Sequence, residues 1–164
     1  MENNTITISP IGHVLSTRTE VIDDRWDEET SAIVIQDTFE PEVLSGLSEF
    51  SHIEVIYYFN QVDASKITLG ARHPRNNPDW PKVGIFAQRG KNRPNRLGAT
   101  LCRIVSVKGH KIHVEGLDAI DGTPVIDIKP VMKEFLPREP VRQPAWSEEI
   151  MSNYWAPKSK QYHE

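Results

Sequence analysis

The sequence predicts a mainly β protein, a small antiparallel β-barrel with a few short helices. Several short runs rich in β-branched residues are separated by turn residues, and alternating apolar and polar residues flank Lys108-Gly109-His110. Alternation on both sides of a glycine-containing turn is typical of a β-hairpin. Short strands joined in this way favour a barrel or a sandwich over a doubly wound sheet.

Each expected element follows from its local composition. The expected strands are 6–14, 31–36, 52–60, 83–87, 101–107, 111–117 and 123–128. Segment 40–47 predicts a short helix, because Pro41 lies in its first turn and Gly46 near its end. A closing helix is expected after the proline-rich stretch, with Ser147 as its cap.

The 164 residues are expected to form one β-barrel domain over 1–140, followed by a C-terminal tail with a short helix over 141–164. No apolar run reaches the roughly 18–20 residues of a membrane span, and the N-terminus lacks the regions of a secretory signal. Cys102 is the only cysteine, which excludes a disulfide framework and a multi-cysteine zinc site. We therefore expect a cytoplasmic protein without membrane or metal partners, in which Cys102 is buried and unreactive.

Charge is distributed unevenly along the chain. The net charge is −4, yet segment 66–111 contains eleven basic residues and one acidic residue, Asp79, so its charge is +10 and that of the remainder is −14. Either the basic segment folds against the acidic flanks and the charges neutralise one another, or it forms a site for a polyanion such as nucleic acid.

Segment 84–98 combines four cationic residues, two asparagines and three glycines behind an apolar strand end. Arginines supply fork-shaped donors, and glycines let the backbone approach a ligand closely. The segment is therefore either a ligand-binding loop or a solvated, turn-rich loop. No G-x-G-x-x-G or G-x-x-x-x-G-K-[ST] motif occurs, so the two common nucleotide-binding loops are absent.

Other polar positions have two interpretations each. Asn60 and Gln61 either read the edge of a base or ribose or end their strand, and Asp121 either forms an Asx-turn or binds a ligand. Trp26 and Trp80, which lie in polar loops, either stack on a base or plug the core or a partner chain. The histidines lack metal-ligand spacing and no catalytic triad can be assembled, so no catalytic residue is predicted.

Four sequence blocks, in their order and spacing, resemble the TsaA-like (TrmO) family of S-adenosylmethionine-dependent tRNA methyltransferases. They are PIGHV at 10–14, GLSEFSHIEVIYYFNQ at 46–61, VGIFAQRGKNRPNRLGATLCRI at 83–104 and LDAIDGTPVIDIKPV at 117–131. The resemblance implies a small β-barrel methyltransferase that forms a homodimer, with the S-adenosyl-L-methionine site near the subunit interface. It also implies tRNA as the partner, N-methylated at threonylcarbamoyladenosine beside the anticodon.

The resemblance also implies particular site residues. The expected cofactor-binding residues are Asn60, Gln61, Phe86, Ala87, Arg89, Arg93, Asn95, Ala99, Ile120, Asp121, Gly122 and Thr123. The residues expected to bind the substrate are Trp26, Arg75, Lys91 and Arg96.

The sequence departs from the family pattern in the arginine-rich segment. The family's Ser-Pro is replaced at Gly90 and Lys91, and an arginine stands at position 96 in place of a proline. We also expect a short form without the C-terminal domain of longer members. We expect these changes to affect substrate identity more than cofactor binding. Two alternatives therefore stay open: an S-adenosylmethionine-binding sensor or accessory protein, and a methyltransferase that acts on a small molecule.

Overall fold

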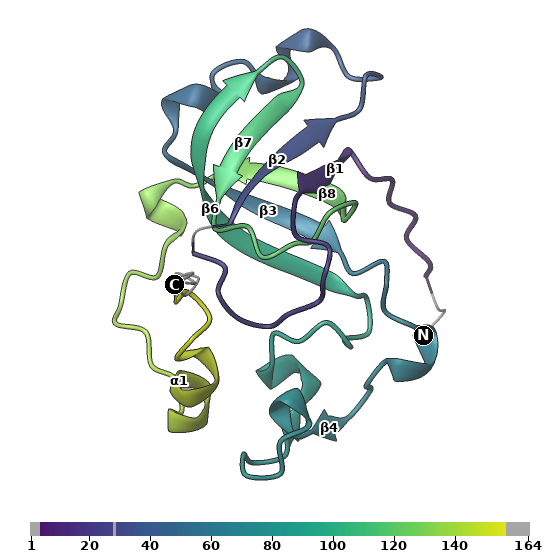
Figure 1. Ribbon diagram of the computed structural model, residues 1–164, viewed down its shortest axis with the longest axis vertical. Helices are drawn as coiled ribbons and strands as arrows, with labels where there is room; N and C mark the ends of the chain where they lie inside the picture. Colours follow the sequence, from purple (N-terminus) through teal and green to yellow (C-terminus); the bar gives the residue numbers. More distant parts are fainter. Residues whose placement is uncertain (1–3, 28, 157–164) are drawn as a thin grey trace, which may run out of the picture.

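A computed structural model describes residues 4–27 and 29–156 and confirms the predicted fold class. Six strands close an antiparallel barrel in the order β1-β2-β7-β6-β3-β8 (Figure 1). The strands are β1 (Gly12–Ser16), β2 (Thr30–Ile35), β3 (His52–Tyr58), β6 (Leu97–Lys108), β7 (Lys111–Glu115) and β8 (Pro124–Pro130). The predicted hairpin is confirmed, because β6 and β7 pair antiparallel on either side of the turn at Gly109.

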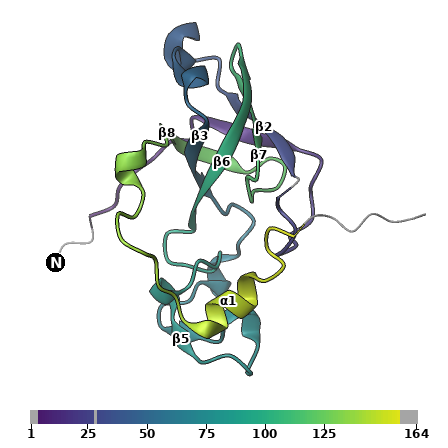
Figure 2. The ribbon, with the colours of Figure 1, turned by 90° about the vertical axis from the view of Figure 1, so that its left-hand side faces the viewer.

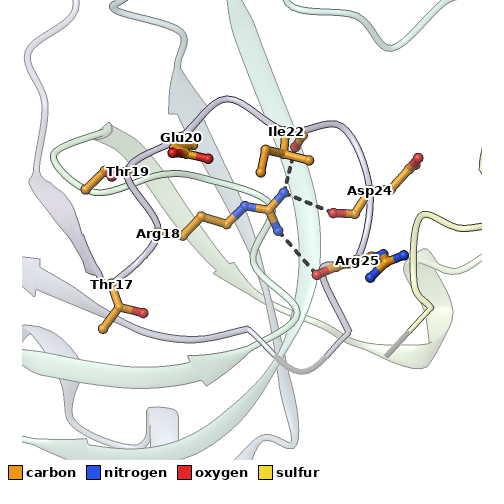
Figure 3. Close-up of a pocket in the computed structure, with 7 residues that line it drawn as sticks. All are labelled: Thr17, Arg18, Thr19, Glu20, Ile22, Asp24 and Arg25. Atoms are coloured by element: carbon orange, nitrogen blue, oxygen red, sulfur yellow. Dashed lines mark hydrogen bonds between the residues drawn. The ribbon is translucent and has the colours of Figure 1, made fainter. Parts of the chain in front are cut away.

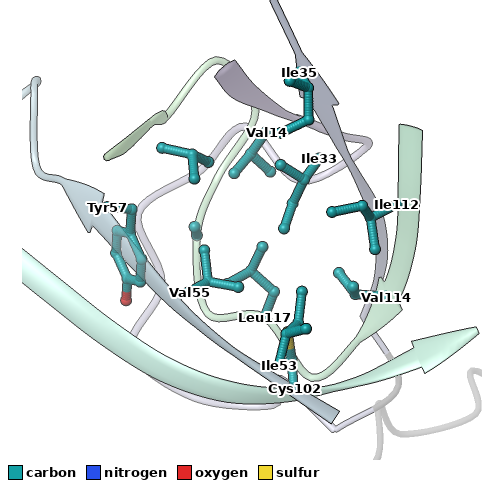
Figure 4. Packing of buried hydrophobic residues seen from close by; sticks show 12 residues of the cluster. Val14, Ile33, Ile35, Ile53, Val55, Tyr57, Cys102, Ile112, Val114 and Leu117 are labelled. Atoms are coloured by element: carbon teal, nitrogen blue, oxygen red, sulfur yellow. The ribbon is translucent and has the colours of Figure 1, made fainter. Parts of the chain in front are cut away.

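Alternate residues of the strands fill the barrel interior (Figure 4). This core cluster consists of Val14, Ile33, Ile35, Ile53, Val55, Tyr57, Cys102, Ile112, Val114, Leu117, Ala119 and Val125. Cys102 is only 2% exposed, as expected. Burial raises the pKa of its thiol to about 12, so the reactive thiolate is scarce at neutral pH.

Two glycines allow close contacts inside the barrel. Gly12 pairs with Ile35 of β2 and with Val125 of β8, so it lies where β1 joins both neighbours. A Cβ atom at this position would overlap the carbonyl oxygen of Val34. At Gly98, a Cβ atom would lie 2.5 Å from two ring atoms of Tyr57. Both positions therefore require glycine because of the space available.

Two expected elements are shorter or tighter than predicted. The strand expected over 6–14 begins only at Gly12, since Ile6 and Ile8 find no neighbouring strand and are 80% and 56% exposed. The helix expected over 40–47 is replaced by two 3-10 turns, Pro41–Leu44 and Leu47–Glu49. Gly46 separates them with a φ of 81°, a left-handed conformation that interrupts a helix.

The other corrections concern the ends of elements. The strand expected over 83–87 is limited to β5 (Val83–Gly84), and a 3-10 turn over Ile85–Ala87 follows. The closing helix is α1 (Ala145–Met151), but Pro144, not Ser147, occupies its N-cap position. The Ser147 hydroxyl lies inside the helix and donates to the carbonyl oxygen of Pro144 at 2.7 Å.

A small lobe, residues 63–96, extends from one end of the barrel (Figure 1). It contains the two-stranded pairing of β4 (Ala71–Arg72) with β5. The C-terminal segment runs from β8 to this lobe, where α1 lies beside it (Figure 2). There the indole N–H of Trp80 donates to Glu149 at 2.8 Å. In the part of the chain that the structure describes, no helix combines the length and apolar character needed to cross a membrane.

Candidate functional site

The arginine-rich loop is shaped by its own guanidinium groups. Arg89 donates to the carbonyl oxygen of Ala99 at the start of β6. Arg93 donates to the carbonyl oxygen of Gln88 at 2.9 Å, and Arg96 donates to that of Val62, also at 2.9 Å. Bonds of this kind fix an irregular loop, because each ties a side chain of the loop to a backbone carbonyl oxygen. The predicted loop is therefore an ordered structure.

The strand-end amides lie next to this loop. Asn60 and Gln61 follow β3 and are exposed, and the backbone N–H of Asn60 donates to the carbonyl oxygen of Tyr58 at 2.8 Å. The Phe59 N–H donates to the carbonyl oxygen of Arg96 at 2.8 Å, which joins the two segments. The structure thus brings together the predicted residues of segments 60–61 and 89–99. Phe86, which precedes the arginine loop in the sequence, lies in the lobe and is 81% exposed.

The predicted turn over 120–123 lies against β1. The carboxylate of Asp121 accepts from the backbone N–H of Ser16 at 2.9 Å, and the Asp121 N–H donates to the carbonyl oxygen of Arg18 at 2.8 Å. Gly122 adopts a φ of 75° and donates to the carbonyl oxygen of Val14 at 2.8 Å. Asp121 therefore holds the turn against β1, which favours the structural interpretation of its carboxylate.

A carboxylate that the sequence did not single out joins these segments. Asp118 Oδ1 accepts from the hydroxyl of Tyr57 at 2.8 Å and from that of Thr100, and Asp118 Oδ2 accepts from the hydroxyl of Tyr154. We call these four residues the Asp118 cluster. Hydrogen bonds to an ionised acceptor are stronger than neutral ones, so three of them hold the carboxylate firmly. No local signal marks the cluster, because its members are 97 residues apart from first to last.

The charge of the arginine loop reaches the Asp118 cluster. Burial first, and then the neighbouring Asp118 carboxylate, raise the pKa of Tyr57 and of Tyr154 well above the ordinary tyrosine value. The guanidinium of Arg89 acts on both phenols in the opposite direction. Arg89 bonds the carbonyl oxygen of Ala99, and the next residue, Thr100, donates to Asp118. The arginine loop is therefore connected, through the start of β6, to the turn that begins at Asp118.

These raised values predict a loss of stability in alkali. Below about pH 10 the folded and the unfolded protein both keep the phenolic proton. Above that pH the unfolded chain releases a proton that the folded protein retains. Each phenol should then lower the free energy of unfolding by about 1.4 kcal/mol per pH unit. Replacing Tyr57 by Phe should make this slope shallower by one such contribution, measured by urea unfolding between about pH 8 and 11. Equal slopes for both proteins would contradict the assignment.

A second feature beside the turn is the loop over 17–26. The guanidinium of Arg18 donates to the carbonyl oxygens of Ile22, Asp24 and Arg25 at 2.7, 2.9 and 3.2 Å (Figure 3). Its other face lies 3.4 Å from the ring centre of Trp26. The loop borders an open hollow of about 450 Å³, lined by Thr17, Arg18, Thr19, Glu20, Ile22, Asp24 and Arg25. Arg18 is therefore the centre around which this loop folds.

The residues expected to bind the substrate differ in their surroundings. Trp26 is 4% exposed and covered by Arg18, so it plugs the core instead of presenting a face for stacking. Arg75 is paired with the Asp24 carboxylate at 2.7 Å. Lys91 and Arg96 lie half-buried in the arginine loop.

The structure also divides the basic segment. Lys108 and Lys111 lie on the β6–β7 hairpin, at the end of the barrel opposite the lobe (Figure 1). Arg103 is paired with Glu115 on the neighbouring strand. The basic residues of the lobe alone can therefore contribute to a polyanion site beside the arginine loop. Across residues 4–27 and 29–156, no group of three or more His, Cys, Asp or Glu residues is placed to hold a metal ion.

The closed antiparallel barrel places the chain in a β-barrel class of protein, distinct from doubly wound nucleotide-binding folds. The family model for the tRNA-methyltransferase O N-terminal domain matches residues 22–135, and the chain belongs to this family. The resemblance noted in the sequence is thereby confirmed.

Individual relatives agree with this assignment. A human tRNA (adenine(37)-N6)-methyltransferase is 34% identical over 114 residues, which cover 70% of this chain and 25% of that protein. A probable S-adenosyl-L-methionine-binding protein of Methanothermobacter thermautotrophicus is 35% identical and covers 82% of this chain and 96% of that protein. The crystal structure of TrmO from Pseudomonas aeruginosa superposes with a TM-score of 0.68 at 27% identity, covering 85% of this chain and 62% of that one. The chain thus spans about a quarter of the human relative.

Proposed function

We propose that this protein is an S-adenosylmethionine-dependent methyltransferase that methylates the N6 of an adenosine in the tRNA anticodon loop, with threonylcarbamoyladenosine as the expected acceptor. Family membership supports the activity, and the names of the human and archaeal relatives support the acceptor and the cofactor. The observation that carries the proposal is the joining of the arginine loop to the Asp118–Thr123 turn, through the Arg89–Ala99 bond and the bond from the next residue, Thr100, to Asp118.

The residues present fit this cofactor. S-adenosylmethionine combines an adenosine, a carboxylate and two cationic centres, so its site needs an exposed ring, polar amides, a cation and an anion. Phe86 supplies an exposed ring, Asn60 and Gln61 supply exposed amides, and Arg89 and Asp118 supply the two charges. We propose that these groups, which come from the barrel end and from the lobe, together orient such a molecule.

The mechanism requires little chemistry from the side chains. The bound cofactor supplies an already activated methyl group. The chain's own residues hold donor and acceptor in line and exclude water. In this arrangement Arg89 fixes the start of β6 through Ala99, and Asp118 fixes the turn on the other side of the site. Because the cluster hydroxyls remain protonated, they act as hydrogen-bond donors to Asp118.

Titration calorimetry with S-adenosylmethionine tests the cofactor. We expect binding to the wild type and an affinity at least about tenfold lower for Arg89→Ala, since the variant loses both the anchor on Ala99 and the positive charge. Arg103→Ala is the matched control, because Arg103 lies on β6 but pairs with Glu115. Binding that is undetectable for the wild type, or unchanged for Arg89→Ala, would refute this part of the proposal.

Methyl transfer tests the acceptor. Radiolabelled methyl groups should be incorporated into tRNA that carries threonylcarbamoyladenosine but lacks the methyl mark, and tRNA binding should weaken with salt. Cofactor binding without transfer to any acceptor would favour a sensor or accessory protein. Transfer to small molecules only, without salt-sensitive tRNA binding, would favour the small-molecule methyltransferase.

We also propose that the protein acts as a homodimer in the cytoplasm. Apolar side chains of the lobe support the dimer: Leu69 and Phe86 are 84% and 81% exposed, and they lie near each other because the Ile85 N–H bonds to the carbonyl oxygen of Gly70. Exposed apolar side chains grouped in this way are typical of a surface that a partner covers.

A further inference from the structure

The C-terminal segment contacts the candidate site. We propose that residues Ala145–Ala156, here called the strap, position the Asp118–Thr123 turn, and that Tyr154 is the positioning residue through which the strap acts. That the turn binds the cofactor rests on the proposed function, whereas the coupling between strap and turn stands on the contacts themselves. The family model ends at residue 135, before the strap begins.

The first connection is direct. The Tyr154 hydroxyl donates to Asp118 Oδ2, while Tyr57 and Thr100 hold Asp118 Oδ1 from the barrel wall. The strap therefore supplies the hydrogen bond to one of the two carboxylate oxygens. Without it, the barrel would grip Asp118 on one side only, and the residues that follow Asp118 would be less firmly placed.

The second connection runs through the backbone and the Arg18 loop. The carbonyl oxygens of Asn153 and Tyr154 accept from the N–H groups of Arg25 and Trp26 at 3.1 and 2.8 Å. The ring of Trp26 packs under the guanidinium of Arg18. The carbonyl oxygen of Arg18 in turn accepts from the Asp121 N–H at 2.8 Å.

The two connections therefore converge on one short turn from opposite directions: Tyr154 reaches its first residue, Asp118, and the Arg18 loop reaches Asp121. The far end of the strap is held as well, since Glu149 accepts from the Trp80 indole of the lobe at 2.8 Å. A segment attached to the lobe, to the Arg18 loop and to the barrel can set the geometry of all three together.

Tyr154→Phe tests the inference, because it deletes the hydroxyl and keeps the ring. Amide hydrogen exchange should become about tenfold faster over 118–123, and the affinity for S-adenosylmethionine should fall about tenfold. Ser147→Ala is the matched control: it also deletes one strap hydroxyl, but that hydroxyl donates to the carbonyl oxygen of Pro144, the residue just before the strap. We expect the control to leave exchange in the turn and cofactor affinity unchanged.

Exchange in 118–123 that is the same in Tyr154→Phe and the wild type would overturn the inference, whatever the affinity does. If the wild type binds no cofactor, the proposed function fails, and the exchange measurement still decides the coupling. If Tyr154→Phe does not fold, Glu149→Ala replaces it, because this variant releases the strap from Trp80 at its far end. Exchange in the turn should then rise about threefold, and no rise would overturn the inference.

Discussion

Asp118→Ala is expected to lower the free energy of unfolding by about 3–5 kcal/mol and to abolish cofactor binding. Three hydroxyls share this carboxylate as their acceptor, and Tyr57 and Thr100 are 3% and 7% exposed. Removing the carboxylate takes this acceptor from the buried Thr100 hydroxyl and leaves Tyr57 with the longer bond to the Asp118 carbonyl oxygen, at 3.2 Å. Such a loss costs more than the bonds alone, because the buried donors are no longer fully satisfied. Urea unfolding followed by tryptophan fluorescence measures the first effect, and calorimetry the second.

One further variant separates the charge of Asp118 from its shape, and a second variant serves as the control. Asp118→Asn keeps the size of the side chain and one oxygen acceptor, so its loss of stability should be smaller than that of the alanine variant. Asp79→Ala removes an exposed carboxylate of the lobe and should change stability little. An Asp118→Ala protein as stable as the wild type would show that the hydroxyls find other partners and that the cluster does not fix the site.

The barrel was predictable because strand signals are local. In β6 and β7 the alternation of apolar and polar residues and the turn at Gly109 lie within one continuous stretch, so the pairing of the two strands follows from it. The register shift between Ile104 and Ser106 does not follow from the alternation. The start of β1 was not predictable in this way. Ile6 and Ile8 have the composition of a strand, but the strand itself begins only at Gly12, where β2 and β8 supply partners.

The candidate site was only partly predictable, because its residues meet across the fold. The sequence drew attention to Asp121, which the structure uses to hold the turn, and passed over Asp118, three residues earlier. No residue pattern near Asp118 predicts its hydrogen-bond partners. Tyr57 and Thr100 resemble ordinary strand residues, and Tyr154 lies in the expected tail. The resemblance to a family identified segments, whereas the contacts between segments required the three-dimensional structure.

The basic segment 66–111 also shows what the structure adds to the sequence. The basic segment and its acidic flanks left two interpretations open, and the structure realises each in a different place. Arg75 is neutralised by Asp24 from the acidic flank, as the first interpretation held. The guanidinium groups of the arginine loop instead donate to backbone carbonyl oxygens. None of these three bonds joins an arginine to a carboxylate, so none of them neutralises the positive charge. A site for an anionic partner can therefore persist at the lobe although the net charge is −4.

Gly12→Ala is expected to destabilise the barrel by about 3 kcal/mol or more, which corresponds to a fall of roughly 6–12 °C in the unfolding temperature. The added Cβ atom would overlap the carbonyl oxygen of Val34 and lie 3.1 Å from the Cα of Ile35. Both are backbone atoms of β2, so no side chain can rotate away to relieve the contact. Because Gly12 also pairs with Val125 of β8, moving β1 to make room would disturb the closure of the barrel. Thermal unfolding followed by circular dichroism measures the effect.

Gly70→Ala is the matched control, because a Cβ atom at Gly70 meets no atom within 4 Å and its φ is not positive. The same chemical change there should leave the unfolding temperature nearly unchanged or raise it slightly, since alanine restricts the unfolded chain more than glycine does. A Gly12→Ala protein that unfolds together with the control would mean that β1 can shift without cost. The closure of the barrel through Gly12 would then contribute little to stability. The Asp118–Thr123 turn, which bonds to β1, would have to be held in place by contacts other than those of a fixed β1.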